Sequence, residues 1–260
     1  MQLATWNVNS LKVRLPQVLQ WLQSNPVDVL CLQELKLTDD KFPITTLEAA
    51  GYRSFFAGQK TYNGVAILVR EGNAIDTASL VANNPLFADE QKRLLALTVN
   101  GVRVICGYFP NGQAVGSEKY QYKLAWLDAL HNWIALEMQQ HAQLALLGDY
   151  NIAPEDRDVH DPAAWEGMVH VSPPERERFF KLAQLGLVDV FRQFEQPEKS
   201  YSWWDYRMMG FRRNHGLRID LILLTPPLAQ RCTACTVDKT PRAWEQPSDH
   251  APVVATLNLL

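Results

Sequence analysis

The feature that most limits how this chain can fold is the stretch from Leu144 to Pro154, LALLGDYNIAP. Its consecutive apolar residues predict a buried β-strand, and Gly148 and Pro154 mark the turn through which the chain leaves it. Asp149 and Asn151 stand at this exit. Because side chains two residues apart on extended chain point to the same side, a carboxylate and an amide are presented together at the edge of a sheet. This favours a reaction centre, and an Asp-Asn turn that only closes a strand is the alternative.

Other apolar runs of similar length are separated by turn signals, the pattern of a protein built largely from hairpins. The clearest hairpin is centred on Asn100-Gly101. The expected strands are Leu3–Val8, Val27–Leu32, Tyr52–Phe56, Val65–Val69, Leu94–Val99, Val102–Tyr108, the run from Leu144, Arg218–Leu224, Thr233–Val237 and Ala251–Leu257. Helical spacing of apolar residues predicts helices over Arg14–Ser24, Tyr120–Gln140 and Pro173–Gly186, with a shorter one ending at Gly51. These elements predict an α+β fold of antiparallel sheets covered by helices.

The length of 260 residues allows one large domain or two small ones. No low-complexity linker or charge run divides the sequence, so we expect one domain over residues 1–260. A composition of 47% apolar and 20% charged residues is that of a globular enzyme. No apolar run approaches the ~20 residues that cross a bilayer, and the first residues lack the basic and apolar regions of a signal peptide. We therefore expect a cytoplasmic protein without a membrane partner.

The four cysteines do not form the pattern of a disulfide framework. Cys31 and Cys106 lie inside apolar runs, which predicts buried, reduced thiols. Cys232 and Cys235 have the spacing of a redox or half-zinc motif, but the sequence offers no second pair of ligands, so we favour a structural role.

Polar side chains recur where the apolar strands end. They are Asn7, Glu34, Tyr108, Asp149 with Asn151, Asp220 inside its strand, and Asp249 with His250 just before the last strand. Any one of them is typical of a turn or a cap. Together they offer the oxygen ligands that a hard divalent cation prefers, and also a base and donors for the attack of water on phosphorus.

Seven short motifs that carry these residues occur in the order found in the exonuclease III / AP endonuclease family. They are TWNVNS (5–10), LQELK (32–36), YNGVA (62–66), YFPNG (108–112), GDYNIA (148–153), LRID (217–220) and SDHAP (248–252). The chain therefore resembles the bacterial exonuclease III-like branch of this family, within the superfamily of endonucleases, exonucleases and phosphatases. The resemblance implies a four-layer α/β sandwich, with two mainly antiparallel β-sheets packed face to face and flanked by helices. It also implies that Mg2+ or Mn2+ assists phosphodiester hydrolysis in DNA.

The resemblance implies metal-binding and base roles for four of these residues. Glu34 resembles the principal metal ligand, with Asn7 beside it. Asp249 resembles an outer carboxylate or a ligand of a second metal. Asp149 resembles the residue that orients or deprotonates the attacking water. The sequence leaves open whether Asp149 or His250 is the base, and we favour Asp149.

The remaining matched residues resemble groups that handle the phosphate. Asn151 and Tyr108 resemble donors to its oxygens as negative charge develops. Asp220 and His250 resemble a carboxylate–imidazole pair, in which the carboxylate holds the ring in one tautomer and keeps it charged. A buried ion pair between Asp220 and Arg218 is the structural alternative.

The segment from Lys199 to Arg218 interleaves basic and aromatic residues, which suits contacts to phosphates, sugars and unstacked bases. In the family, this loop and the Trp203 region line the pocket for the sugar at the scissile site. Lys119 and Lys123, at the head of the long helix, form a second, weaker basic patch. The residues expected to bind DNA are Asn111, Lys119, Lys123, Trp203, Arg207, Arg212, Arg213 and Leu217. These basic groups explain how a chain of net charge −3 binds DNA, and they predict strongly salt-dependent binding.

The sequence departs from the family pattern at His170, where the family usually has glycine, serine or another small residue. This position borders the pocket that an abasic deoxyribose must enter. An imidazole here is expected to hinder a flipped-out abasic site within duplex DNA and to admit a frayed 3′ terminus, which needs less distortion. A histidine that points to solvent or touches a phosphate is the alternative. We therefore rank 3′→5′ exonuclease and 3′-phosphatase or phosphodiesterase activity above AP endonuclease activity.

The expected partner is double-stranded DNA with 3′ ends or abasic sites, bound by a monomer. Two other functions are alternatives, and the second comes from a different functional class. A phosphatase of the same superfamily that acts on sugars or phosphoinositides is disfavoured by the basic and aromatic segment. A non-catalytic DNA-binding module is disfavoured because every polar strand end is present.

Overall fold

The first of two six-stranded sheets is built from both ends of the chain. The structure, a computed structural model, describes residues 1–259. The strand order in this sheet is β13-β14-β1-β2-β4-β3. The strands are β1 Gln2–Asn7, β2 Val29–Gln33, β3 Tyr52–Ala57, β4 Val65–Arg70, β13 Cys232–Val237 and β14 Val253–Leu257. The two ends of the chain meet because β1 pairs with β14 in the middle of the sheet.

The second sheet comes from the central part of the sequence, in the order β5-β6-β7-β8-β12-β9. Its strands are β5 Ile75–Ala82, β6 Leu94–Val99, β7 Val102–Tyr108, β8 Leu144–Asp149, β9 Val188–Asp189 and β12 Asp220–Leu224. A small separate ladder pairs β10 Trp203–Trp204 with β11 Gly216–Leu217.

The helices lie outside the two sheets. The α-helices are α1 Leu11–Ser24, α2 Ile44–Ala49, α3 Glu118–Gln140, α4 Pro162–Trp165, α5 Pro173–Gln184, α6 Gly210–Arg213 and α7 Pro226–Ala229. Short 3-10 helices cover Asp39–Lys41, Asp156–Asp158, Val190–Gln193, Arg207–Met209 and Thr240–Ala243. Within residues 1–259, no helix combines the length and the apolar character needed to cross a membrane.

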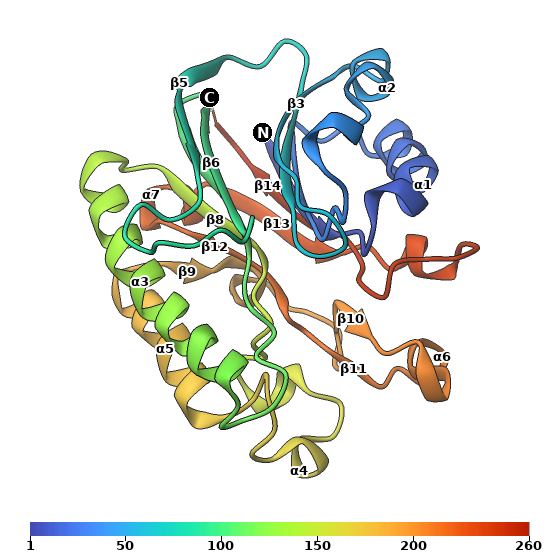
Figure 1. Cartoon of the computed structure of the whole chain (residues 1–260), viewed down its shortest axis with the longest axis vertical. Coiled ribbons are helices and arrows are strands. Elements are labelled where there is room, and N and C mark those ends of the chain that lie inside the picture. The colour runs from blue at the N-terminus through green and yellow to red at the C-terminus, as the bar shows by residue number, and fades with distance from the viewer. Residues whose placement is uncertain (260) are drawn as a thin grey trace.

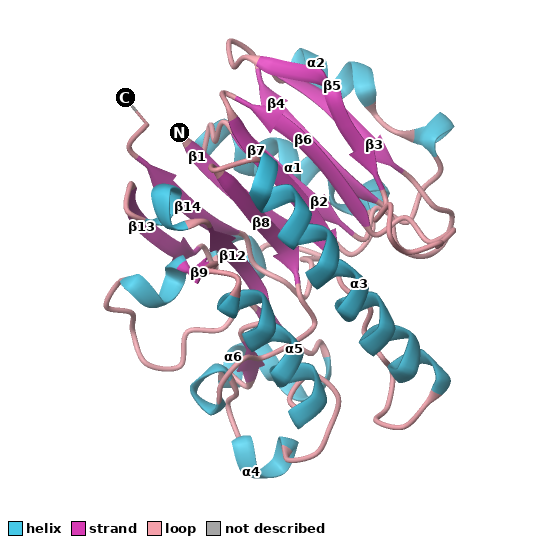
Figure 2. Ribbon diagram, turned by 90° about the vertical axis from the view of Figure 1, so that its left-hand side faces the viewer, coloured by secondary structure: helices cyan, strands magenta, loops and turns pink. Residues whose placement is uncertain are grey.

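Three buried clusters define the layers. The central cluster joins the facing sides of the two sheets, with Leu3 and Ile67 from one and Leu147 from the other. A second cluster packs the outer side of the second sheet against α3 and α5, and a third packs the outer side of the first sheet against α1 and α2. Figures 1 and 2 show the sheets between these two pairs of helices. The predicted four-layer sandwich is therefore confirmed.

Each sheet is antiparallel except for one parallel pair, and these two pairs position the site. In the first sheet β1 runs parallel to β2, with Asn7 opposite Gln33. In the second sheet β7 runs parallel to β8, with Tyr108 opposite Asp149. Because the carboxyl ends of parallel strands meet at one edge, each pair delivers its terminal polar residues to the same rim.

The predicted strands and helices are present with bounds within three residues of the predicted ones, whereas the short elements β9, β10, β11, α4, α6 and α7 were not predicted. The strand β5 was not predicted, because it is largely exposed and its sequence lacks an apolar run. Helix α1 begins at Leu11 rather than at Arg14, so Pro16 lies inside the helix and not in its first turn. The hairpin about Asn100-Gly101 has the predicted bounds, and both central residues adopt the positive φ that its turn requires.

Candidate active site

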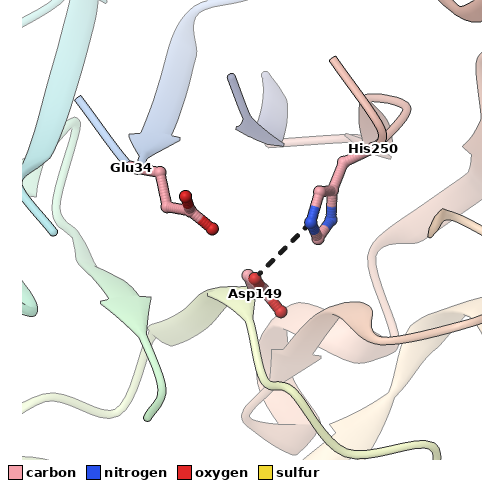
Figure 3. Close-up of side chains that lie close together, drawn as sticks. All are labelled: Glu34, Asp149 and His250. Atoms are coloured by element: carbon pink, nitrogen blue, oxygen red, sulfur yellow. Dashed lines mark ion pairs between the residues drawn. The ribbon is translucent and has the colours of Figure 1, made fainter. Parts of the chain in front are cut away.

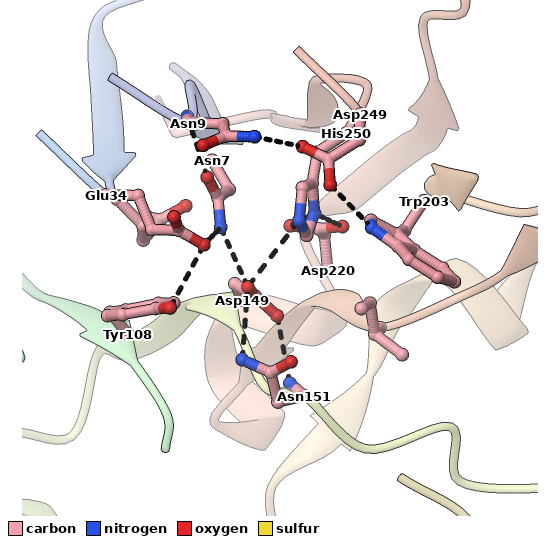
Figure 4. A network of polar contacts seen from close by, with 12 residues as sticks. Asn7, Asn9, Glu34, Tyr108, Asp149, Asn151, Trp203, Asp220, Asp249 and His250 are labelled. Atoms are coloured by element: carbon pink, nitrogen blue, oxygen red, sulfur yellow. Dashed lines mark hydrogen bonds and ion pairs between the residues drawn. The ribbon is translucent and has the colours of Figure 1, made fainter. Parts of the chain in front are cut away.

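The polar residues at the strand ends converge on one rim of the sandwich, as Figure 4 shows. Asn7 ends β1 and Glu34 follows β2, both in the first sheet. Tyr108 and Asp149 end β7 and β8 in the second sheet. Asp220 begins β12 directly opposite Asp149, which corrects its predicted place inside a strand. The sequence prediction that these segments form one site is consistent with this geometry.

Asp149 lies at the centre of the group and is 1% exposed. Its Oδ2 accepts hydrogen bonds from Asn7 Nδ2 at 2.9 Å and from Asn151 Nδ2 at 3.3 Å, and its Oδ1 accepts one from the Asn151 amide at 2.9 Å. Burial, opposed by the His250 charge, raises the pKa of Asp149 to about 7. A carboxyl group that titrates near neutral pH is suited to accept a proton from water.

His250 and Asp220 form the predicted carboxylate–imidazole pair. His250 Nδ1 lies 2.8 Å from Asp220 Oδ2, which also accepts a hydrogen bond from Ser202 Oγ at 2.7 Å. Although burial alone lowers it, the charges of Asp220 and Asp149 raise the pKa of His250 to about 10, so the ring carries its charge at neutral pH. Its Nε2 lies 3.8 Å from Asp149 Oδ2, and Figure 3 shows the ring facing that carboxylate. Arg218 pairs instead with Asp158 and Asp189, so the alternative of an Asp220–Arg218 pair is wrong.

Glu34 is more accessible than Asp149 and Asp220, with its side chain 17% exposed. Its Oε1 accepts hydrogen bonds from Tyr108 Oη at 3.0 Å and from Asn7 Nδ2 at 2.9 Å. Burial, with the charges of Glu34 and Asp149, keeps the pKa of Tyr108 well above its usual value, so the phenol remains a donor.

The donor set beside Glu34 fits a hard divalent cation. The Lys36 ammonium group already lies between two oxygens there, 2.9 Å from Glu34 Oε2 and 2.5 Å from Asn9 Oδ1. Ligand atoms of Glu34, Asp149 and His250 also lie within 4.8 Å of one another. Since a charged imidazole has no free lone pair, His250 is not a ligand in this state. Carboxylate and amide oxygens are what Mg2+ and Mn2+ prefer.

Two predicted metal ligands have other contacts in the structure. The Asn7 amide oxygen accepts the Asn9 backbone N–H at 2.9 Å, and its nitrogen faces Glu34 and Asp149. In this structure Asn7 therefore bridges two carboxylates, and its role towards a metal stays a prediction. Asp249 accepts hydrogen bonds from Asn9 Nδ2 at 3.0 Å and from Trp203 Nε1 at 2.9 Å, and its role towards a metal stays a prediction.

Several site residues adopt left-handed backbone conformations that non-glycine residues rarely take. Glu34 has φ 53°, Asn151 φ 49° and His170 φ 79°. Such conformations persist only where surrounding contacts hold them, and they often mark functional sites. Glycine would adopt the backbone conformation of His170 without strain.

His170 points into the protein beside the active site and is 7% exposed, so the alternative of a solvent-facing ring is wrong. Its Nδ1 lies 2.6 Å from the Asn151 carbonyl oxygen, and its Nε2 lies 3.5 Å from Asn111 Nδ2. Burial and the Lys123 charge lower the pKa of His170 to about 4, so the ring is neutral at pH 7. Because Nδ1 faces a carbonyl, it carries the proton.

Some of the predicted DNA-binding residues are accessible near the site. Trp203 is partly exposed beside Asp249, and the Arg207 side chain is 85% exposed. Asn111, Lys119, Arg212 and Arg213 are also exposed. The exposed residues Tyr206, Met208 and Met209 extend this surface. DNA contact at these positions stays a prediction.

Two residues of that set are buried and cannot contact DNA directly. Lys123 is 0% exposed and forms an ion pair with Glu175, and Leu217 is 0% exposed in the core below Trp203. In the same segment Tyr201, Trp204 and Arg218 are also buried, so three of its ten basic and aromatic residues are structural. Spacing alone does not distinguish a surface lysine from one that a helix turns inward.

The sequence prediction missed several residues that complete the site. Asn9 and Lys36 contact Asp249 and Glu34, and Ser202 holds Asp220. Asn9 and Lys36 lie in quoted motifs, and both have positive φ, 44° and 54°, but only the folded chain shows this. Ser202 had no signal in the sequence.

Comparisons with known proteins place this geometry in context. The chain matches the model of the "Endonuclease/Exonuclease/phosphatase family" over residues 4–250. It is 34% identical to exodeoxyribonuclease III of Haemophilus influenzae, over 98% of this chain and 99% of that protein. The structure of the 3′ phosphatase NExo from Neisseria, bound to a product DNA hairpin, is 47% identical, with a TM-score of 0.96 and 100% of each chain covered. An AP endonuclease structure from Archaeoglobus fulgidus is 38% identical, with a TM-score of 0.94 and 100% of each chain covered.

Proposed function

This chain belongs to the endonuclease/exonuclease/phosphatase family, and we propose that it is a DNA-repair nuclease of the exonuclease III type. Its main activity is the processing of 3′ ends in duplex DNA, as a 3′→5′ exonuclease and as a 3′-phosphatase or phosphodiesterase. The observation that carries the preference for 3′ ends is the buried ring of His170 against Asn151 and Asn111. The Neisseria relative described as a 3′ phosphatase supports it.

The proposed chemistry assigns the activation of water to Asp149. Its carboxylate accepts a proton from the water that attacks phosphorus, since its pKa of about 7 leaves much of it ionised at neutral pH. The two hydrogen bonds from Asn151 and the one from Asn7 fix the direction of the carboxylate. A base held in one orientation near the phosphate lowers the entropic part of the barrier.

The charge that develops on the phosphate is met by donors of this chain. His250 presents a charged Nε2–H, held in place by Asp220, and Tyr108 presents a phenol that stays protonated. Fixed donors of this kind stabilise charge without reorganisation. Mg2+ or Mn2+, held by Glu34 with Asn9 and Asp249 near it, would neutralise part of the phosphate charge when bound.

We also propose that the protein acts as a monomer in the cytoplasm on double-stranded DNA. The four cysteines are all free thiols, and Cys31, Cys106 and Cys235 are buried, which suits a reducing compartment. The partly exposed surface about Trp203, Arg207, Arg212 and Arg213 would follow the phosphate backbone.

AP endonuclease activity is the second candidate, because the Archaeoglobus fulgidus relative is described as an AP endonuclease. The two activities differ in how much space they need. An abasic deoxyribose inside a duplex must be rotated out of the helix into a pocket, whereas a terminal nucleotide reaches the site by fraying. We therefore expect the buried imidazole of His170 to hinder cleavage at an internal abasic site more than hydrolysis at a DNA 3′ end.

A substrate comparison with Mg2+ tests the proposal. Purified protein is given duplexes with a recessed 3′ end, a 3′-phosphate or an internal abasic analogue, alongside His170→Gly and, as a control, His131→Ala on α3. We expect the parent to process the first two about 100-fold faster than the third, and His170→Gly to raise abasic cleavage about tenfold. Abasic cleavage that is robust in the parent and unchanged in His170→Gly would contradict the preference for 3′ ends.

A further inference from the structure

Lys123 forms a buried hub behind the active site. It lies on α3 with its side chain 0% exposed. Its Nζ donates to the Asn151 carbonyl oxygen at 2.7 Å, to the Asn111 carbonyl oxygen at 3.1 Å and to the Glu175 carboxylate. An ammonium group has three protons, so all three are used. Two of its three acceptors belong to the loops that follow β7 and β8, where the site residues stand.

Glu175 completes the hub from helix α5. Its Oε1 accepts the His170 backbone N–H at 3.0 Å, and its Oε2 accepts the Ser172 backbone N–H at 3.2 Å as well as the Ser172 hydroxyl group. Ser172 and Glu175 form the capping box that starts α5. The Lys123–Glu175 pair thus joins α3, α5, both site loops and the segment that carries His170.

Two of the residues held by this hub have strained backbones. Asn151 and His170 have φ 49° and 79°, and each is fixed by the pair directly, Asn151 through its carbonyl oxygen and His170 through its amide. Gly112, next to Asn111, has φ 90°, and a Cβ there would lie 3.0 Å from Lys123 Cδ. Left-handed non-glycine residues need such outside contacts to persist.

One further step connects the hub to the reacting groups. Asn151 donates both its backbone N–H and its side-chain Nδ2 to Asp149, at 2.9 Å and 3.3 Å. The Asn151 carbonyl oxygen, on the other side of the same residue, accepts Lys123 and the His170 ring. A shift of Asn151 would therefore turn the Asp149 carboxylate.

Stability alone does not account for the burial of this pair. The attraction within a buried ion pair offsets little more than its desolvation cost. Replacing both partners therefore often leaves the free energy of unfolding unchanged, whereas removing one leaves an unpaired buried charge. The same helix offers a comparison, because Glu137 on α3 pairs with Arg103 with side chains 11% and 3% exposed. That pair ties α3 to β7 and to Ser79, which contributes its carbonyl oxygen. It holds no active-site residue.

We propose that Lys123 and Glu175 are positioning residues, which hold Asn151 and thereby aim the Asp149 carboxylate. This inference rests on the proposed function for its rate effect, and it also makes a structural claim that does not depend on turnover. Lys123 was expected from the sequence to bind DNA, and its buried place assigns it this other task.

The test uses the full chain and a paired substitution, Lys123→Met with Glu175→Gln, so that no unpaired charge is left in the interior. The kcat for release of a 3′-phosphate from duplex DNA should fall about 100-fold, because small misplacements of a catalytic group cost about this much. The KM for DNA should change less than about threefold, because the side chains of Lys123 and Glu175 are both 0% exposed and do not reach bound DNA. The matched control, Arg103→Met with Glu137→Gln, should keep the parent kcat.

Hydrogen exchange in the same proteins provides a readout that needs no activity. The backbone amides of residues 149–153 should exchange at least about tenfold faster in the Lys123/Glu175 variant than in the parent, with no such change in the control. An unchanged exchange rate, an equal effect in the control, or a variant that cannot fold would each overturn the inference. If the variant exchanges faster than the parent as expected, but the parent cleaves no 3′-end substrate, the proposed function would be overturned. The difference in hydrogen exchange would still support the claim that the pair holds residues 149–153.

Discussion

The two parallel strand pairs deliver acids to the same rim in different surroundings. In the first sheet Glu34 follows β2 and remains partly open, with its side chain 17% exposed and next to the Lys36 ammonium. In the second sheet Asp149 ends β8 with its side chain 1% exposed, enclosed by Asn7, Asn151 and His250. Both acids stand at the carboxyl end of a parallel strand pair, and the groups that cover the two ends differ.

This difference in cover separates the chemistry of the two acids. An accessible carboxylate leaves room for a metal ion and its waters, which Mg2+ retains when it binds proteins. A buried carboxylate loses solvation, and its pKa is raised to about 7, where it can exchange a proton with water. We therefore expect the open end to hold metal and the closed end to activate water.

The largest expected effect is that of Asp149→Asn. The amide keeps the shape of the side chain and cannot accept the proton of water, so kcat for 3′-end hydrolysis should fall about 1000-fold or more. Additional Mg2+ should not restore the rate, because the loss lies in proton acceptance. Steady-state kinetics on a 3′-phosphate duplex would measure it. A variant with near-parental kcat would assign the base to another residue.

A second prediction concerns His170, next to the closed end, and the stability of the protein in acid. His170 is neutral in the folded protein because burial lowers its pKa from 6.5 to about 4, whereas the unfolded chain binds a proton below 6.5. The neutral His170 ring thus contributes fully to the free energy of unfolding above pH 6.5, and this contribution is lost as the pH falls towards 4. The parent should lose about 3 kcal/mol more over this range than His170→Asn, which does not titrate. Urea denaturation at several pH values would measure this, and parallel curves would refute it.

A third prediction concerns the pH dependence of the hydrolysis rate, which should follow the titration of Asp149 and His250 at the closed end. Because Asp149 must be ionised, kcat/KM should rise about tenfold per pH unit below about 7 and then level off. It should fall again above about 10, where His250 loses the proton that its neighbours stabilise. A rate that does not depend on pH between 5 and 8 would show that the ionisation of Asp149 at the closed end does not control hydrolysis.

Much of this site could be predicted from the sequence because strand ends obey simple geometry. The run Leu144–Leu147 had to be a strand, and its parallel partner β7 brings Tyr108 to the same rim as Asp149. The apolar runs and the hairpin about Asn100-Gly101 fixed most elements in the same way. The periodicity of apolar residues and the preferences of turn residues are local properties, so they can be interpreted without knowledge of the fold.

The rest depended on contacts between distant parts of the chain. Lys123 and Lys119 look alike in the sequence, yet helix α3 turns one into the interior towards Glu175 and leaves the other in solvent. The orientation of Asn7, which presents nitrogen rather than oxygen, depends on the Asn9 backbone. His170 was expected to restrict the site, but its bond to Asn151 could not be foreseen from a polar, irregular segment.

The division between an open, metal-holding end and a closed, water-activating end can be tested most directly by Mn2+ binding without DNA. Electron paramagnetic resonance would give the Mn2+ affinity of the parent, Glu34→Gln and Asp149→Asn. We predict that Glu34→Gln weakens binding more than about tenfold, while Asp149→Asn changes it less than about threefold. Equal weakening in both variants would contradict the account, because Asp149 would then be a ligand rather than the base.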